Sequence, residues 1–167
     1  MLDAKNFSSF CTVKRIEEAD IEKALSLCKG NPEFYKHCPP SATSESILAD
    51  SKKLPKGKNM EDKYYVGFFI EEELTALLDL IDKFPNEETV FLGFFMMNVK
   101  FQHKGIGTAI VEDLCRYLKA SGYKFVRLGW VKGNLQSEAF WHKNGFWETG
   151  VSYETERYKV IVAEKKL

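Results

Sequence analysis

The most apolar run of the chain, Val90 to Met97, is interrupted only by Gly93. It is bounded by Glu87-Glu88-Thr89 on one side and by Asn98 on the other. A run without polar alternation is typical of a strand that is covered on both faces. We therefore predict that Val90 to Met97 is the central strand of a sheet.

A helical pattern follows this strand after a short turn, from Lys104 to Ala120. Its apolar face ends near Ser121-Gly122 and consists of Ile106, Ile110, Leu114, Tyr117 and Leu118. A further strand is predicted over Phe125 to Trp130. A strand, a helix and a strand joined by short links form a βαβ crossover, so the later strand should run parallel to the central one.

The remaining patterns predict a sheet with helices at the start and near the end of the chain. Asn31 to Pro40 contains three prolines and is predicted to be irregular. The predicted elements are a strand over Ser9–Arg15, helices over Asp20–Gly30 and Ser44–Leu54, strands over Lys63–Ile70 and Leu74–Phe84, a helix over Asn134–Lys143, and strands over Phe146–Tyr153 and Arg157–Ala163. The order is βααβββαβαββ, an α/β fold with a mixed sheet.

Composition favours one domain over residues 1–167, because 44% apolar and 14% aromatic residues can supply a full core. Lys plus Arg and Asp plus Glu are both 24, so no overall field draws the protein to nucleic acid or membrane. The four cysteines form no Cys-x-x-Cys pair and have no histidine at zinc spacing, and no metal site is expected. The sequence has no signal peptide pattern and no apolar run of about 20 residues, which favours the cytoplasm.

The turn from Gln102 to Thr108, Gln-His-Lys-Gly-Ile-Gly-Thr, joins the central strand to the long helix. Such a turn directs unpaired backbone N–H groups and the positive end of the helix dipole at one point, which suits a phosphate or pyrophosphate. Gly105 and Gly107 allow close approach, and His103 and Lys104 add side-chain donors. A Gly-x-Gly is also often only a tight turn. The Walker string is absent, and Arg127 stands where a Rossmann fingerprint needs an acidic residue.

The turn resembles the acetyl-CoA loop of the GCN5-related N-acetyltransferases, Gln/Arg-x-x-Gly-x-Gly/Ala, at Gln102, Gly105 and Gly107. The second signature of that family is an Asn that opens a short helix ending in Gly-Phe. It corresponds here to Asn134 and Gly145-Phe146. The resemblance covers roughly Tyr64 to Phe146 and implies a fold in which strands four and five part around the cofactor.

The resemblance also implies which residues hold acetyl-CoA. Backbone groups of strand four would pair with the pantetheine arm, the turn would hold the pyrophosphate, and Asn134 would bond the arm or serve only as a helix N-cap. The expected cofactor residues are Phe95, Met96, Met97, Gln102, His103, Lys104, Gly105, Ile106, Gly107, Thr108, Asn134, Trp141 and Lys143.

Amine acetylation needs a donor to the thioester oxygen, a base and an acid. The expected donor is the backbone amide of Met97. Strand four has no titratable residue, and Gly129 occupies the strand-five position that relatives often fill with Glu. Asp79 is therefore the expected base. The alternatives are Tyr35, His37 or Tyr65, each acting through water. Trp141 stands where the family commonly has a Tyr acid, and an indole does not usefully release a proton. Tyr153 or solvent could supply that proton instead.

The acceptor is expected to be a small or amino-acid-like amine, because aromatic residues could line its entrance. The predicted pocket residues are Phe34, Tyr35, His37, Tyr64 and Tyr65, although Phe34, Tyr35 and His37 could instead only cover the core. The alternatives are a protein N-acetyltransferase, a CoA-binding regulatory module without turnover, and a plain nucleotide binder. A monomer or homodimer is expected.

Overall fold

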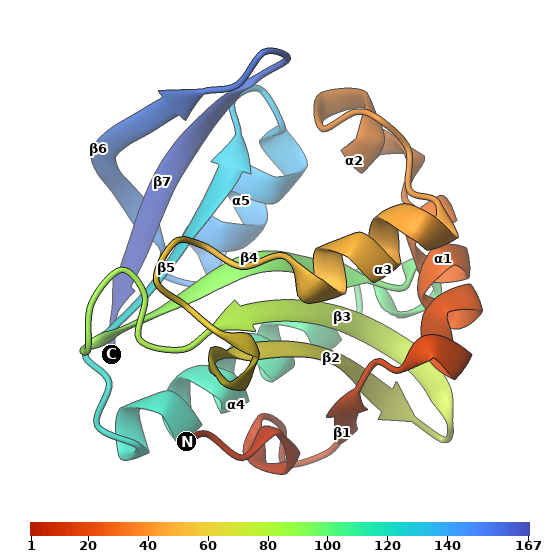
Figure 1. Ribbon diagram of the computed structural model, residues 1–167, viewed down its shortest axis with the longest axis horizontal. Helices are drawn as coiled ribbons and strands as arrows, with labels where there is room; N and C mark the ends of the chain where they lie inside the picture. Colours follow the sequence, from red (N-terminus) through yellow and green to blue (C-terminus); the bar gives the residue numbers. More distant parts are fainter.

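The computed structural model describes all 167 residues as one mixed sheet with helices on both faces (Figure 1). The sheet order is β1-β2-β3-β4-β5-β7-β6. The strands are β1 (Thr12–Arg15), β2 (Lys63–Ile70), β3 (Glu73–Ile81), β4 (Thr89–Met97), β5 (Phe125–Val131), β6 (Trp147–Glu154) and β7 (Lys159–Lys166). The helices are α1 (Ile21–Lys29), α2 (Pro32–His37), α3 (Ser44–Lys52), α4 (Ile106–Ala120) and α5 (Leu135–Lys143), with 3-10 turns at Ala4–Asn6, Glu18–Asp20, Met60–Asp62 and Val99–Phe101.

The α/β class and the mixed sheet are confirmed, but the element order contains one more helix than expected. The prolines of Asn31 to Pro40 predicted an irregular chain, whereas Pro32–His37 forms α2. Pro32 stands at the first helical position, where its missing N–H costs nothing and its fixed φ suits a helix. The order is therefore βαααβββαβαββ.

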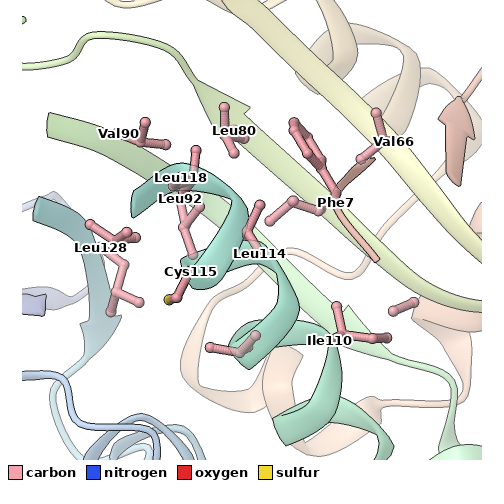
Figure 2. Packing of buried hydrophobic residues seen from close by; sticks show 14 of the residues in the cluster. Phe7, Val66, Leu80, Val90, Leu92, Ile110, Leu114, Cys115, Leu118 and Leu128 are labelled. Atoms are coloured by element: carbon pink, nitrogen blue, oxygen red, sulfur yellow. The ribbon is translucent and has the colours of Figure 1, made fainter. Parts of the chain in front are cut away.

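Helix α4 packs its apolar face against one side of the sheet (Figure 2). Ile110, Leu114 and Leu118 are buried there against strand residues such as Leu80 and Val90. A second cluster on the opposite face joins α1 and α3 to β2, β3 and β4. Burial on both faces explains why β4 reads as a nearly continuous apolar run.

Strands β4 and β5 run parallel, as predicted, but they stay together over only part of their length. Their pairing extends from Thr89 opposite Phe125 to Leu92 opposite Leu128. Beyond that point β4 remains paired with β3 as far as Met97, and β5 remains paired with β7 as far as Val131. The sheet therefore splits between the carboxyl-terminal halves of its two central strands.

A bulge in β4 lies where the split begins. Leu80 pairs with Leu92 and Asp79 pairs with Phe94, so Gly93 is the extra residue of β4. A bulge changes the direction of the side chains that follow it. The part of β4 that no longer pairs with β5 begins directly after Gly93.

None of the helices combines the length and the apolar character needed to cross a bilayer.

Candidate functional site

The turn between β4 and α4 exposes a continuous set of free backbone donors. No backbone amide from His103 to Thr108 donates a hydrogen bond within the chain, and the first helical bond runs from Ala109 N–H to Gly105 O at 3.0 Å. Gly105 has a φ of 76° and His103 a φ of 58°, the left-handed conformation that lets the chain turn into the helix. Six donors at a helix N-terminus form an anion-binding site.

The split edge of β4 presents further backbone groups. The amide of Asn98 donates to Thr75 O on β3 at 2.8 Å. Because backbone direction alternates along a strand, the amides of Met97 and Phe95 point the other way, toward the split. This geometry leaves them free to pair with an extended ligand between β4 and β5, as expected for Met97.

A cavity of about 560 Å³ connects the split with the turn. Its walls come from the end of β4, the turn, the start of α4, helix α5 and the segment after α1. The lining residues are Asn31, Phe34, Phe95, Met96, Met97, Phe101, Gln102, His103, Gly105, Gly107, Thr108, Asn134, Gln136, Ser137, Ala139, Phe140, Trp141 and Lys143. The sequence-predicted cofactor residues thus lie together, except for two.

The two exceptions are Lys104 and Ile106, which do not line the cavity. The Lys104 side chain is exposed, and its Nζ lies 5.9 Å from the centroid of the Phe101 ring. Ile106 packs against the core beneath α4. Only their backbone amides belong to the set of free donors.

Several lining residues were not predicted from the sequence. Ser137 and Phe140 follow Asn134 at helical spacing, so the periodicity of α5 could have identified them. Asn31 and Phe101 carried no such signal, because nothing in their local sequence shows that they meet the same cavity.

Gly107 is buried where α4 meets two cavity residues. A Cβ atom at this position would lie 3.3 Å from Met97 Cγ and 3.3 Å from Phe140 Cε2. The absence of a side chain therefore lets the first turn of α4 approach the walls of the cavity closely. Gly105 has open space around its Cβ position and is needed for its φ instead.

Asn134 is the N-cap of α5 and also lines the cavity. Its Oδ1 accepts a hydrogen bond from the Ser137 amide at 3.1 Å, which makes it the N-cap of α5. Its side-chain NH₂ makes no hydrogen bond within the chain and remains a donor at the cavity wall. The cap is therefore compatible with a ligand role.

Trp141 is the centre of an aromatic cluster at the cavity. Its ring contacts Phe95, Phe140 and Phe146, with centroid distances of 5.8, 4.9 and 5.0 Å. The neighbouring His142 does not line the cavity, and its Nε2 bonds Glu148 Oε1 at 3.0 Å. Trp141 thus supplies shape and an indole N–H, but no acid.

His142 also belongs to a group of potential metal ligands on the outer side of α5. The ligand atoms of Glu138, His142 and Glu148 lie within 4.8 Å of one another. His142 and Glu148 are in this group because they are hydrogen-bonded to each other.

The predicted acceptor residues do not form one pocket. Tyr64 and Tyr65 are neighbours on β2, so their side chains point to opposite faces of the sheet. Tyr64 lies on the α4 face and donates to Leu2 O at 2.9 Å, so its assignment to the pocket is wrong. Tyr65 is buried on the other face, beneath α1.

Helix α2 carries the remaining predicted acceptor residues. Phe34 lines the cavity and meets Phe94 edge to face at a centroid distance of 5.7 Å. Tyr35 packs behind it, and burial raises the pKa of its hydroxyl beside the Cys28 thiol. His37, at the end of α2, does not line the cavity.

Asp79 lies on β3 opposite Phe94, at the bulge of β4. Its carboxylate oxygens accept from the buried Lys63 Nζ at 2.8 and 2.9 Å, and Lys63 Nζ also donates to Lys53 O at 2.9 Å. Burial raises the pKa of Asp79, and the bonds from Lys63 oppose that shift. Asp79 is therefore a desolvated carboxylate held in one position, outside the lining of the cavity.

The position on β5 that could carry another carboxylate has no room for one. A Cβ atom at Gly129 would lie 2.6 Å from Val160 Cγ1 on β7. Val160 thus occupies the space of a side chain at this position.

Comparison with known proteins agrees with this geometry. Residues 28–146 match the model of the acetyltransferase (GNAT) family. Among curated proteins, none matches the chain in sequence. The fold is similar to an acetyltransferase from Thermus thermophilus, with 16% identity, a TM-score of 0.73, and 94% of this chain and 97% of that chain covered.

Two further solved structures are similar. The paia N-acetyltransferase from Thermoplasma acidophilum, in complex with coenzyme A, is 18% identical, with a TM-score of 0.68 and coverage of 94% and 99%. The ribosomal-protein-S18-alanine N-acetyltransferase from Escherichia coli is 15% identical, with a TM-score of 0.66 and 93% coverage of both chains. The family model spans most of the chain, and both of its predicted signatures meet at one cavity. The chain therefore belongs to the GNAT acetyltransferase family, whose members use acetyl-CoA.

Proposed function

We propose that this protein transfers the acetyl group of acetyl-CoA to a primary amine of a small or amino-acid-like molecule. The observation that carries the proposal is the row of six free amides, His103 to Thr108, at the end of a split sheet. A pyrophosphate suits the amides, and an amide-containing pantetheine arm suits the unpaired edge of β4.

The residues at the cavity suit both the pyrophosphate and the pantetheine arm of such a cofactor. His103 and Lys143 are the only lining side chains that can be cationic, and His103 is on the turn with the free amides. The Asn134 NH₂ and the amides of Phe95 and Met97 are donors along the split. Bound acetyl-CoA supplies an activated acyl group as a thioester, and the Met97 amide is our candidate donor to the thioester oxygen.

The residues that line the cavity support a small and largely apolar acceptor. No Asp or Glu is among the lining residues, whereas Phe34, Phe95 and Phe140 give it an apolar wall. Binding of a polyamine or a lysine-rich protein tail is favoured by clustered carboxylates. The cavity thus favours a small amine with an apolar body over a basic protein segment.

We assign the general base to Asp79, acting through a bridging water because its carboxylate does not line the cavity. Its pKa is raised by burial, which brings a carboxylate closer to the range in which a base works well near neutral pH. Lys63 fixes its orientation. Tyr35 and Tyr65 are poorer bases, since burial raises the pKa of both hydroxyls.

The leaving thiolate needs no acid from the chain in this account. Trp141 occupies the position of the usual Tyr, and Tyr153 lies outside the cavity lining. A thiol with a pKa of about 8.5 leaves tolerably without help. Solvent then protonates the thiolate.

A second candidate is a CoA-binding regulatory module with little or no turnover. It is favoured by the absence of a carboxylate among the cavity residues and by Trp141 in place of Tyr. The two candidates differ in chemistry and not in cofactor binding.

Thiol release from acetyl-CoA, measured against a panel of amines, separates them. The panel contains alkyl and aryl amines, amino acids, polyamines and a lysine-containing peptide. The proposed function predicts release well above the amine-free rate with small apolar amines. Tight binding of acetyl-CoA without release for any amine would favour the regulatory module, and release only with the peptide would favour a protein acetyltransferase.

A further inference from the structure

The side chain of Asn31 joins the end of α1 to the end of β4 and the turn after it, which are 66 and 71 positions further along the chain. Its Nδ2 donates to Leu27 O, at the end of α1, and to Met97 O, at the end of β4, both at 3.0 Å. Its Oδ1 accepts from Gln102 Nε2 at 2.7 Å. Gln102 is the first residue of the turn that carries the free amides, and its Nε2 also donates to Met97 O at 3.1 Å.

This use of Asn31 departs from its local role. Asn31 is the N-cap of α2, a position at which an Asn side chain usually accepts a bond from the first helical turn. The side chain makes no such bond here. All of its hydrogen bonds go to α1, β4 and the turn, so the base of α2 is tied to the cofactor side of the cavity.

Helix α2 contributes Phe34 to the same cavity, on the side that the proposed function assigns to the acceptor. It has only six residues, and its attachments are few: Phe34 meets Phe94, Tyr35 lies beside the Cys28 thiol, and Cys38 lies beside the Tyr158 hydroxyl. A helix this short has little stability of its own. Its placement therefore depends on these contacts and on Asn31 at its start.

We propose that Asn31 is a positioning residue that couples occupation of the cofactor turn to the placement of α2, the acceptor-side wall. This inference rests on the proposed function, because it takes the turn as the cofactor site. A ligand that orders Gln102 orders its bond to Asn31, and Asn31 in turn holds the first residue of α2. The acceptor then meets a wall that is fixed only when the cofactor is bound.

Hydrogen exchange of the full-length protein, with and without acetyl-CoA, tests the coupling. In the wild type, acetyl-CoA is expected to slow exchange at residues 103–108 and also at residues 33–38. The expected slowing in α2 is about fivefold or more, the lower end of coupling between sites. In Asn31→Leu, the turn should still be protected by acetyl-CoA, whereas α2 should not.

Two controls make the result specific. Asn59→Leu removes another Asn N-cap, at the turn Met60–Asp62, and should leave the wild-type pattern intact. Asn31→Asp keeps the acceptor for Gln102 Nε2 and loses only the donors to Leu27 O and Met97 O, so acetyl-CoA should still protect α2 in this variant. If Asn31→Leu does not fold, Gln102→Met removes the same Gln102–Asn31 hydrogen bond. Exchange at the turn and at α2 is then compared in that variant in the same way.

Equal protection of α2 in Asn31→Leu and the wild type would overturn the inference, as would protection of the turn alone in the wild type. Absence of protection at the turn itself in the wild type would overturn the proposed function and this inference together. A steady-state comparison adds a second readout. With the best amine of the panel, Asn31→Leu should raise the KM of the amine more than the Kd of acetyl-CoA.

Discussion

The carboxylate of Asp79 lies close to the position that a Cβ atom of Gly93 would occupy. A Cβ atom at Gly93 would lie 3.1 Å from Asp79 Oδ2, although the two residues are on neighbouring strands. Gly93 is the bulge residue at which β4 leaves β5. A carboxylate from β3 thus reaches the point where the sheet opens, while β4 has no titratable side chain of its own.

Replacement of this carboxylate tests its assignment as base. Asp79→Asn keeps the shape and removes the proton acceptor, so kcat should fall by about 10²-fold or more, in the range of general base catalysis. The Kd of acetyl-CoA should not change, since Asp79 does not line the cavity. Steady-state kinetics and calorimetry on the same preparation check both. Unchanged kcat would remove Asp79 from the mechanism.

The pH dependence of kcat should report the same group. A base must be unprotonated, and the raised pKa of Asp79 means that it becomes protonated at a higher pH than an ordinary Asp. Activity should therefore fall as the pH drops through that raised pKa, and Asp79→Asn should lack this acidic limb. Lys63→Met removes the group that lowers the pKa, so the limb should move to higher pH.

Other charged groups near Asp79 also act on its pKa and therefore on the pH profile of kcat. Lys63 on β2 bonds Asp79 directly, and the charges of Asp50 and Lys53, at α3, also act on its pKa. Loss of Lys63 leaves a buried carboxylate unpaired, so Lys63→Met should also lower the melting temperature. Rates are therefore compared well below that temperature. An acidic limb that stays in place in Lys63→Met would assign it to another group.

Gly107→Val should weaken cofactor binding more than it weakens the fold. The added atoms would meet Met97 and Phe140, which both line the cavity, and would push them into it. We expect the Kd of acetyl-CoA to rise about tenfold or more. Ala109→Val is the matched control, because Ala109 is on the same turn of α4 but does not line the cavity. An unchanged Kd with a collapsed melting temperature would mean that Gly107 serves only packing.

Trp141→Tyr distinguishes two views of thiolate departure. If protonation of the thiolate limited turnover, a phenol at this position should raise kcat by part of the ~10² to 10⁴ available from acid catalysis. We expect no gain or a loss, because a smaller ring leaves a gap among Phe95, Phe140 and Phe146. A rise in kcat above about tenfold, at unchanged affinity for acetyl-CoA, would show that protonation is rate-limiting.

The central part of the fold could be predicted from local patterns. Burial on both faces makes β4 continuously apolar, the period of α4 is regular, and the short links of the βαβ unit require parallel strands. The turn and Asn134 were found because their residues stand at fixed separations in the sequence. Most of the cavity wall formed by β4, the turn and α5 follows from these two motifs.

The acceptor side could not be predicted in the same way. Pro32 indicated an irregular chain although proline also begins helices, and α2 was missed. Tyr64 and Tyr65 were assigned to one pocket although the alternation of a strand separates them. The link from Asn31 to Gln102 and the approach of Asp79 to Gly93 depend on strand pairing and tertiary packing, which a single sequence does not encode locally.

Isothermal titration calorimetry of the wild-type protein with acetyl-CoA tests the central claim most directly. The free amides of His103 to Thr108 and the open edge of β4 predict saturable binding at one site per chain. CoA should compete for this site, and ATP and NAD should bind more weakly than either. Absence of binding at millimolar acetyl-CoA, or a preference for ATP or NAD, would contradict the account.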